Sequence, residues 1–395
     1  MSFKLGYRPE LDGLRAIAVI SIMLGHSSLL AKGADLLSPG ASFPTLLRGG
    51  VFGVDIFFVL SGFLITALLL IEHSTFGRID FKAFYIRRVL RLLPAMFLLL
   101  LGCLIYVLLL RPEGSQFGFR AILSAAFYIS NFVFIRHGNL LGMLTPTWSL
   151  SVEEQFYSLW PLVLLICLRL KRQRMFHFIL LGAVCAALLR ARLYGLSVKT
   201  GHSMLGAVAD RLLLARADSL LCGALAAMTV CWQLYSPQKH LTSWRIAGWI
   251  SGLLLGVMLC LARSYGASLF YYTYACASVL TAILIVALIT APPPLLRVVL
   301  TFPPLVYTGR ISYGLYLFHV PVYCLMPATV PALLLPIGGG NAYIMYIVSV
   351  ITAFLIASAS YYLIERKFLK LKHRLYAPRI ESTLASPHQQ AHIIV

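Results

Sequence analysis

The first long apolar run of the chain carries ionisable side chains: residues 9–28 read PELDGLRAIAVISIMLGHSS and include Asp12, Arg15 and His26. An α-helix turns about 100° and rises about 1.5 Å per residue, so Arg15 and His26 share nearly the same face, about 16 Å apart along the axis. Asp12 precedes Arg15 by three residues and lies on that side too. Charges inside a bilayer cost free energy unless they face a partner or a wet cavity. This polar stripe therefore predicts a functional site that a bundle of further helices encloses.

The rest of the chain has the composition of a polytopic membrane protein. Of its 395 residues, 60% are hydrophobic and 12% are charged, and the mean hydropathy is +0.86. Apolar runs of about 18 or more residues recur along the chain, which predicts an all-α bundle of about ten transmembrane helices. We expect the spans at residues 13–32, 51–71, 92–110, 148–168, 176–194, 212–232, 246–263, 269–291, 305–327 and 342–364.

Basic residues fall between the apolar runs and indicate the orientation of the bundle. A net charge of +20 would favour nucleic-acid binding in a soluble protein, but the positive-inside rule explains it here, so we expect no nucleic-acid partner. An eleventh crossing at 119–135 would place the basic segments 169–174 and 365–374 outside, so we interpret 119–135 as a re-entrant segment. We expect both termini in the cytoplasm, a membrane domain over 1–370 and a disordered polar tail over 371–395.

Four ionisable residues on four different spans are expected at similar depth, in the outer half of the bundle. They are His26, Asp55, Glu153 and His319. A neutral imidazole that a carboxylate orients can remove a proton from a hydroxyl near neutral pH. We therefore predict that His26 is a general base and that Asp55 or Glu153 orients it. The alternative for each residue alone is a hydrogen-bonded strut between helices.

The cytoplasmic side predicts a different chemistry. The segment FYIRRVLRLLP, residues 84–94, places Arg87, Arg88 and Arg91 at the head of the third span. Arg88 and Arg91 share a helical face, and guanidinium groups bind phosphate oxygens in pairs. The cluster is therefore a candidate site for a phosphorylated donor, and the alternative is a charge cluster attracted to anionic lipid.

Further residues, His319 among them, are assigned supporting roles. The pair Ser61 and Gly62 suits close helix packing, and Arg216 and Asp218 pair with each other or face an acceptor. Trp148 and Tyr313 are expected to pack in the bundle with a polar tip. The eight cysteines lie within apolar segments without paired spacing, so we expect neither a metal site nor a disulfide framework.

Six motifs, taken together and in order, resemble the signatures of the acyltransferase-3 family of bacterial integral-membrane O-acyltransferases. They are PELDGLRAIAV with His26, GGVFGVDIFFVLSGFLIT, FYIRRVLRLLP, WSLSVEEQFYSLWP, RADSLLCGALAA and ISYGLYLFHVP. The resemblance implies a ten-helix domain that moves an acyl group, commonly acetyl, from cytoplasmic acyl-CoA to a hydroxyl of a carbohydrate, often a cell-surface polysaccharide or lipopolysaccharide. It implies that His26 is the catalytic histidine, that Arg15 is its essential partner, and that Arg88 and Arg91 bind acyl-CoA.

The resemblance also implies a location and leaves alternatives open. We expect a multi-pass protein of the bacterial cytoplasmic (inner) membrane, with acyl-CoA as co-substrate, no metal, and glycan and membrane lipid as partners. Roughly 30 residues follow the last expected span, so we expect no appended SGNH-hydrolase-like domain. Within the class, His26 is alternatively a nucleophile that forms a transient acyl-histidine. Alternatives from other functional classes are a flippase or carrier for a lipid-linked sugar or small molecule, and a scaffold. Consumption of acyl-CoA distinguishes the enzyme from these alternatives.

Overall fold

The computed structural model describes residues 5–27, 50–110, 117–234, 239–261, 267–329 and 341–376, and this part of the chain contains helices and no strand. The predicted all-α membrane bundle is confirmed. The elements in chain order are α1 (Pro9–Gly25), α3 (Gly50–Phe76), α4 (Phe81–Leu109), α5 (Phe119–Ala126), α6 (Ser130–His137), the 3₁₀ helix η2 (Gly138–Leu144), α7 (Thr147–Cys167), α8 (Arg172–Thr200), α9 (Ser203–Arg211), α10 (Leu213–Trp232), α11 (Leu241–Leu261), α12 (Ala267–Thr290), α13 (Pro294–Leu300), α14 (Pro303–Arg310), α15 (Ser312–Thr329), α17 (Asn341–Ser360), the π-helical turn η5 (Tyr361–Glu365) and α18 (Arg366–Tyr376).

Seven stretches of helix in the described residues are long and apolar enough to cross a membrane: α3, α4, α8, α9 with α10, α11, α12, and α17 with α18. The other three expected spans correspond to α1, α7 and α15. With 17 residues, α1 is about 26 Å long, slightly shorter than the hydrocarbon core of a bilayer. Both α1 and α7 carry carboxylates in their sequences, which lowers their hydropathy. Helices that other helices enclose need no continuous apolar surface, and most residues of α1 are indeed buried.

The segment expected to be re-entrant is broken into two short helices. Helix α5 and helix α6 have eight residues each, about 12 Å, so neither is long enough to cross a membrane. Between them Tyr128 has a left-handed backbone, with φ of 53°. The region therefore lacks a continuous eleventh spanning helix.

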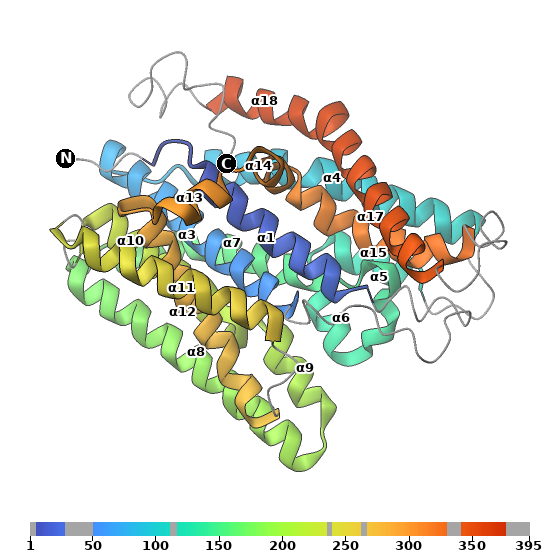
Figure 1. Cartoon of the computed structure of the whole chain (residues 1–395), viewed down its shortest axis with the longest axis horizontal. Coiled ribbons are helices and arrows are strands. Elements are labelled where there is room, and N and C mark those ends of the chain that lie inside the picture. Colours follow the sequence, from blue (N-terminus) through green and yellow to red (C-terminus); the bar gives the residue numbers. More distant parts are fainter. Residues whose placement is uncertain are drawn as a thin grey trace.

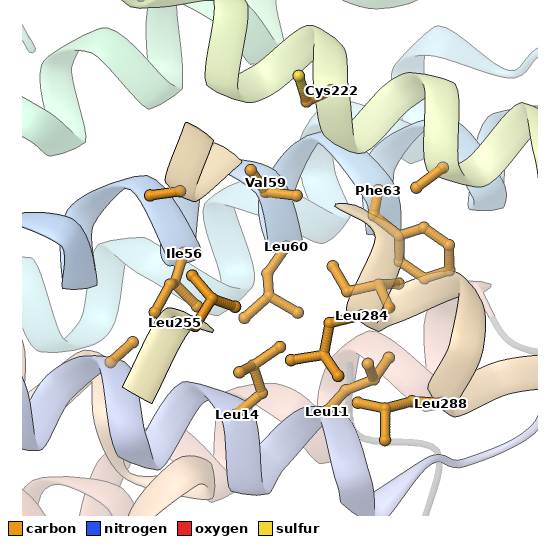
Figure 2. Packing of buried hydrophobic residues seen from close by; sticks show 14 of the residues in the cluster. Leu11, Leu14, Ile56, Val59, Leu60, Phe63, Cys222, Leu255, Leu284 and Leu288 are labelled. Carbon is orange, nitrogen blue, oxygen red and sulfur yellow. The ribbon is translucent and has the colours of Figure 1, made fainter. Parts of the chain in front are cut away.

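The centre of the bundle is formed by α1 and α3. Figure 1 shows α1 between two groups of helices, with α8, α10, α11 and α12 to one side and α4, α15, α17 and α18 to the other. In α3, 83% of the most apolar window is buried, against 22% in α8 and 28% in α4. Figure 2 shows Leu60 of α3 packing toward Leu14 of α1 and Leu284 of α12. The exposed apolar faces of α4 and α8 are those expected of lipid-facing helices.

Two glycines allow α3 and α10 to cross in direct backbone contact. A Cβ at Gly62 would lie 2.0 Å from the carbonyl oxygen of Leu220, and one at Gly223 would lie 2.0 Å from that of Val59. Such small residues let membrane helices approach closely. The close packing anticipated near Ser61 is thus made by its neighbour Gly62.

The start of α1 is fixed against the segment that precedes α15. Arg297 pairs with Glu10 at 3.1 Å, and Arg310 donates to the Tyr7 hydroxyl at 2.9 Å. The expected span 305–327 is interrupted between α14 and α15, close to Gly309, where a Cβ would clash with the Asp12 carbonyl. Helix α18 continues past residue 370, and the rest of the expected tail, 377–395, lies outside the described residues.

Candidate active site

His26 ends α1 and lies beside His319 of α15. It is the first residue after the helix, with φ of −86° and ψ of 1°. Its Nδ1 lies 2.9 Å from Nε2 of His319, and the two rings are stacked, with centroids 5.2 Å apart and planes 13° apart. Nδ1 of His319 lies 3.0 Å from the backbone oxygen of Leu315, one turn earlier in α15. Two imidazoles and a carbonyl thus form one hydrogen-bonded chain.

This chain determines the tautomer of both rings when they are neutral. A carbonyl oxygen only accepts, so Nδ1 of His319 carries the proton and donates it to Leu315. Nε2 of His319 is then the acceptor, and Nδ1–H of His26 donates to it. The lone pair of His26 is therefore on Nε2, the arrangement that a general base requires.

Neither carboxylate predicted to orient His26 bonds to it. Asp55 contacts Arg190, Arg216 and Ser219, and the carboxylate of Glu153 accepts from side chains on α3 and α7. No hydrogen bond joins His26 to a carboxylate among the described residues. Its partner is His319, which sequence analysis predicted at the same depth but only in a supporting role.

Below this pair lies an arginine-lined cavity between α1, α3, α4, α7 and α15, with an empty volume of about 710 Å³. Its charged lining residues are Arg15, Arg88, Arg91 and Glu153. The other lining residues are Val54, Phe57, Phe58, Leu60, Ser61, Leu64, Leu92, Ser149, Leu150, Tyr157, Ser312, Tyr313 and Tyr316. Such a lining suits an anionic group at one end and an apolar arm along the wall.

The predicted donor-binding arginines divide into two groups. Arg88 stacks over the Tyr157 ring at 4.9 Å, and neither Arg88 nor Arg91 forms an ion pair with a carboxylate in the described part of the chain. Arg87, in contrast, pairs with Glu72 at 3.2 Å and does not line the cavity. Arg88 and Arg91 are thus available to an anion, whereas Arg87 ties the start of α4 to the end of α3.

Arg15 faces the same cavity and is held by Asp12. One oxygen of Asp12 lies 3.5 Å from Arg15, and the other accepts from the Tyr7 hydroxyl at 2.9 Å. Arg310 donates to Tyr7 in turn. Asp12, which sequence analysis grouped with the catalytic residues, is here the residue that orients Arg15.

Glu153 projects into the cavity from α7 and is fixed by two donors. Ser61 Oγ and Tyr157 Oη both donate to its Oε1, the latter at 2.9 Å. Ser61 is therefore a polar residue of the cavity wall.

Aromatic rings line the end of the cavity nearest the two histidines. Tyr316 hydrogen-bonds to Ser149 Oγ at 2.6 Å and donates to the Pro146 carbonyl at 3.1 Å. Its ring lies 6.2 Å from Phe57, edge to face, and 5.9 Å from His319. Nearby, the Tyr313 hydroxyl donates to the Leu92 carbonyl at 3.1 Å, which fits the predicted packing with a polar tip.

The acidic and basic residues predicted near an acceptor form a buried network between α3, α8 and α10. Arg190 pairs with Asp218 at 2.5 Å and with Asp55 at 3.6 Å. Arg216 pairs with Asp55 at 3.2 Å, and Ser219 donates to the same oxygen at 2.8 Å. Two guanidinium and two carboxylate groups balance in charge, so these residues clamp the helices together.

Two residues of the site were not singled out from the sequence. Arg190 is 1% exposed and completes this network, and Tyr157 contacts Glu153 and Arg88. An Arg within the expected span 176–194 was the available signal for Arg190. Trp148 was anticipated as packing, and its ring centroid lies 5.9 Å from the Arg216 guanidinium. No cluster of three or more metal-ligating side chains occurs among the described residues.

Comparison with known proteins gives one family. The family model described as "Acyltransferase domain" matches residues 8–363. The peptidoglycan O-acetyltransferase OatA of Listeria monocytogenes is 32% identical over 376 residues, which is 92% of this chain and 56% of OatA. A Bacillus subtilis protein named "Putative peptidoglycan O-acetyltransferase YrhL" is 31% identical over 95% of this chain and 57% of its own length. The chain thus spans slightly more than half of these relatives. No solved structure matches.

Proposed function

Because the chain belongs to the acyltransferase-3 family, we propose that it moves an acyl group from cytoplasmic acyl-CoA to a hydroxyl of a cell-surface glycan. One observation carries the proposal. The hydrogen-bonded chain of His26, His319 and Leu315 leaves Nε2 of His26 free to accept a proton, and the His319 ring lies 5.9 Å from Tyr316, which lines a cavity together with three arginines.

The proposed orientation follows the distribution of basic residues. With the first residues and α18 on the cytoplasmic side of a bacterial inner membrane, α1 and α4 both run outward. Arg15, Arg88 and Arg91 then lie toward the cytoplasm, and His26 lies about 16 Å higher along α1. That separation suits a donor whose phosphates stay near the cytoplasm and whose thioester is carried up by a flexible arm.

Donor binding follows from the cavity lining. Arg88 and Arg91 bind phosphate oxygens of the donor, because guanidinium groups do so with charge-assisted pairs of hydrogen bonds. Arg15, which Asp12 holds in place, adds a third positive charge. The apolar side chains above them, among them Leu60 and Leu150, contact the uncharged arm.

In the transfer step, His26 Nε2 takes the proton of the acceptor hydroxyl while the hydroxyl oxygen attacks the acyl carbon. The carbon–sulfur bond breaks, the CoA thiolate leaves, and the proton passes from His26 to the sulfur. Thioester and alcohol become ester and thiol, with no oxidant or metal required. His319 keeps the His26 ring in the productive tautomer.

The acceptor is a hydroxyl that arrives from the outer side. The names of OatA and YrhL make peptidoglycan the first acceptor to offer, with other surface polysaccharides next. An acetyl group adds about 42 mass units per modified sugar, the difference between acetyl and hydrogen.

The test uses the purified full-length protein in liposomes with acetyl-CoA outside and peptidoglycan fragments on either side. We expect acceptor-dependent release of free CoA thiol and a 42-unit mass increase of the fragments. His26→Ala removes this activity. His177→Ala is the matched control, because that imidazole is exposed on α8 and away from the cavity.

The same assay separates the alternatives. Labelled acyl group trapped on protein without acceptor, and lost in His26→Ala, would mean that His26 is a nucleophile. No release of CoA with any acceptor, together with transport that survives in His26→Ala, would refute the enzyme and favour a carrier.

A further inference from the structure

The arginine-lined cavity stops short of the catalytic imidazole. Neither His26 nor His319 lines it, whereas Tyr316, one turn before His319 in α15, does. The Tyr316 ring faces the cavity and also lies 5.9 Å from the His319 ring. This ring is therefore a wall shared by the cavity and the histidine pair.

Phe57 of α3 completes this wall. It lines the cavity and meets Tyr316 edge to face at 6.2 Å between centroids. On nearly the same face of α3, Gly50 packs against Gly25, the residue before His26. Phe57 follows Gly50 by two helical turns, so it lies below the level of His26, on the path from the cavity.

The two rings are held very differently. Tyr316 is pinned through its hydroxyl by Ser149 and by the Pro146 carbonyl. Phe57 has no polar atom and is only partly buried. When a thioester passes from the cavity to His26, Phe57 is thus the ring that can turn aside.

We propose that the Phe57–Tyr316 pair is a partition that shields the thioester from water. This inference rests on the proposed function. The two rings stand between the donor cavity and the histidine pair, so they separate the thioester from the acceptor side until the Phe57 ring turns aside. Truncation of Phe57 removes one half of this wall and leaves the histidine pair and the three arginines in place.

The test measures release of free CoA from acetyl-CoA without acceptor, for wild type and Phe57→Ala as full-length protein in liposomes. Without acceptor, water converts the thioester to carboxylic acid and free CoA, and closed active sites suppress this reaction. We expect this release to rise at least about tenfold in Phe57→Ala. Phe57→Leu is expected to give an intermediate rate.

Leu68→Ala is the matched control. Leu68 lies on the same helix and is apolar, but it is exposed and does not line the cavity. Its truncation leaves the partition intact, so acceptor-independent release of CoA is expected to stay at the wild-type rate.

A second measurement is acetyl transfer with acceptor present. We expect Phe57→Ala to retain acceptor-dependent transfer, because His26, His319 and the three arginines are unchanged, and this retained transfer shows that the variant is folded.

The outcomes separate this inference from the proposed function. If wild type transfers no acyl group from any donor, both fail. If wild type transfers acetyl, and folded Phe57→Ala has unchanged hydrolysis of the donor, the partition is refuted and the proposed function stands. Equal changes in Phe57→Ala and Leu68→Ala also refute the partition.

Discussion

His319→Phe keeps an aromatic ring of similar size beside His26 but removes the nitrogen that accepts its proton. In the native chain His26 Nδ1 lies 2.9 Å from His319 Nε2. The phenyl ring leaves that N–H without an acceptor and frees the imidazole to adopt the other tautomer. His319→Gln, in contrast, offers an amide oxygen at similar reach, so it can still accept this hydrogen bond.

The magnitude follows from the role of the base. General-base catalysis contributes about 10²- to 10⁴-fold in rate. If the hydrogen bond from His26 to His319 determines which tautomer is present, most of that factor disappears in His319→Phe. We expect kcat to fall at least about 100-fold, close to 3 kcal/mol of transition-state stabilisation. We expect His319→Gln to lose less than about tenfold.

The assay is acceptor-dependent CoA release by the purified variants, with thermal unfolding in detergent as a control for folding. A buried N–H without a partner also costs about 1–3 kcal/mol of stability, so rates are compared well below the unfolding midpoint. Equal loss of kcat in the two variants would refute the argument from tautomers. So would a His319→Phe protein within threefold of wild type.

Other predictions concern the arginines, the helix crossing and the buried charges. Arg88→Ala and Arg91→Ala are each expected to raise KM for acyl-CoA about 10- to 100-fold, since a hydrogen bond to a charged group is worth about 1.5–3 kcal/mol. Arg87→Ala is expected to leave KM unchanged. Initial rates at varied concentrations of acyl-CoA test both expectations. Gly62→Ala places a Cβ 2.0 Å from a backbone oxygen of α10, so the unfolding temperature in detergent should fall, by a free energy of about 1–3 kcal/mol or more. Asp55→Ala leaves the buried Arg216 without its ion-pair partner, while Arg190 keeps Asp218. It is expected to cost about 3–5 kcal/mol, measured as loss of folded protein in thermal scans. An unfolding midpoint equal to that of wild type would contradict the prediction for Gly62→Ala or for Asp55→Ala.

Much of the fold could be predicted because it depends on hydropathy and charge along the chain. The apolar runs predicted the helices, and basic loops argued against a crossing at 119–135, where the structure has two short helices. The interruption between α14 and α15 could not be predicted from hydropathy. It depends on the backbone of α1 lying against Gly309, a contact between segments almost 300 residues apart.

The site was predicted only in part, and the errors in the predicted side-chain contacts have one cause. The depth of a residue follows from its position along a helix, so His26 and His319 were rightly placed at one level. Which residues a side chain contacts depends on the direction in which it points around the helix axis. On α3, Gly53 faces α1; Asp55, two residues later, is turned by about 200° and faces α8 and α10 instead. The small residues of the GGVFG segment mark the face toward α1, and they were the available signal.

The buried network of two arginines and two aspartates also constrains how the protein is made. Asp55 enters the membrane with α3, but its partners Arg190 and Arg216 are synthesised more than 130 residues later. A single charge at the centre of a bilayer costs about 2.5–3.5 kcal/mol on insertion scales.

Until α8 has been synthesised, then, the nascent bundle holds this carboxylate without a counter-ion, and until α10 follows the network is incomplete. The first helices can therefore reach their final packing only after the last partner arrives.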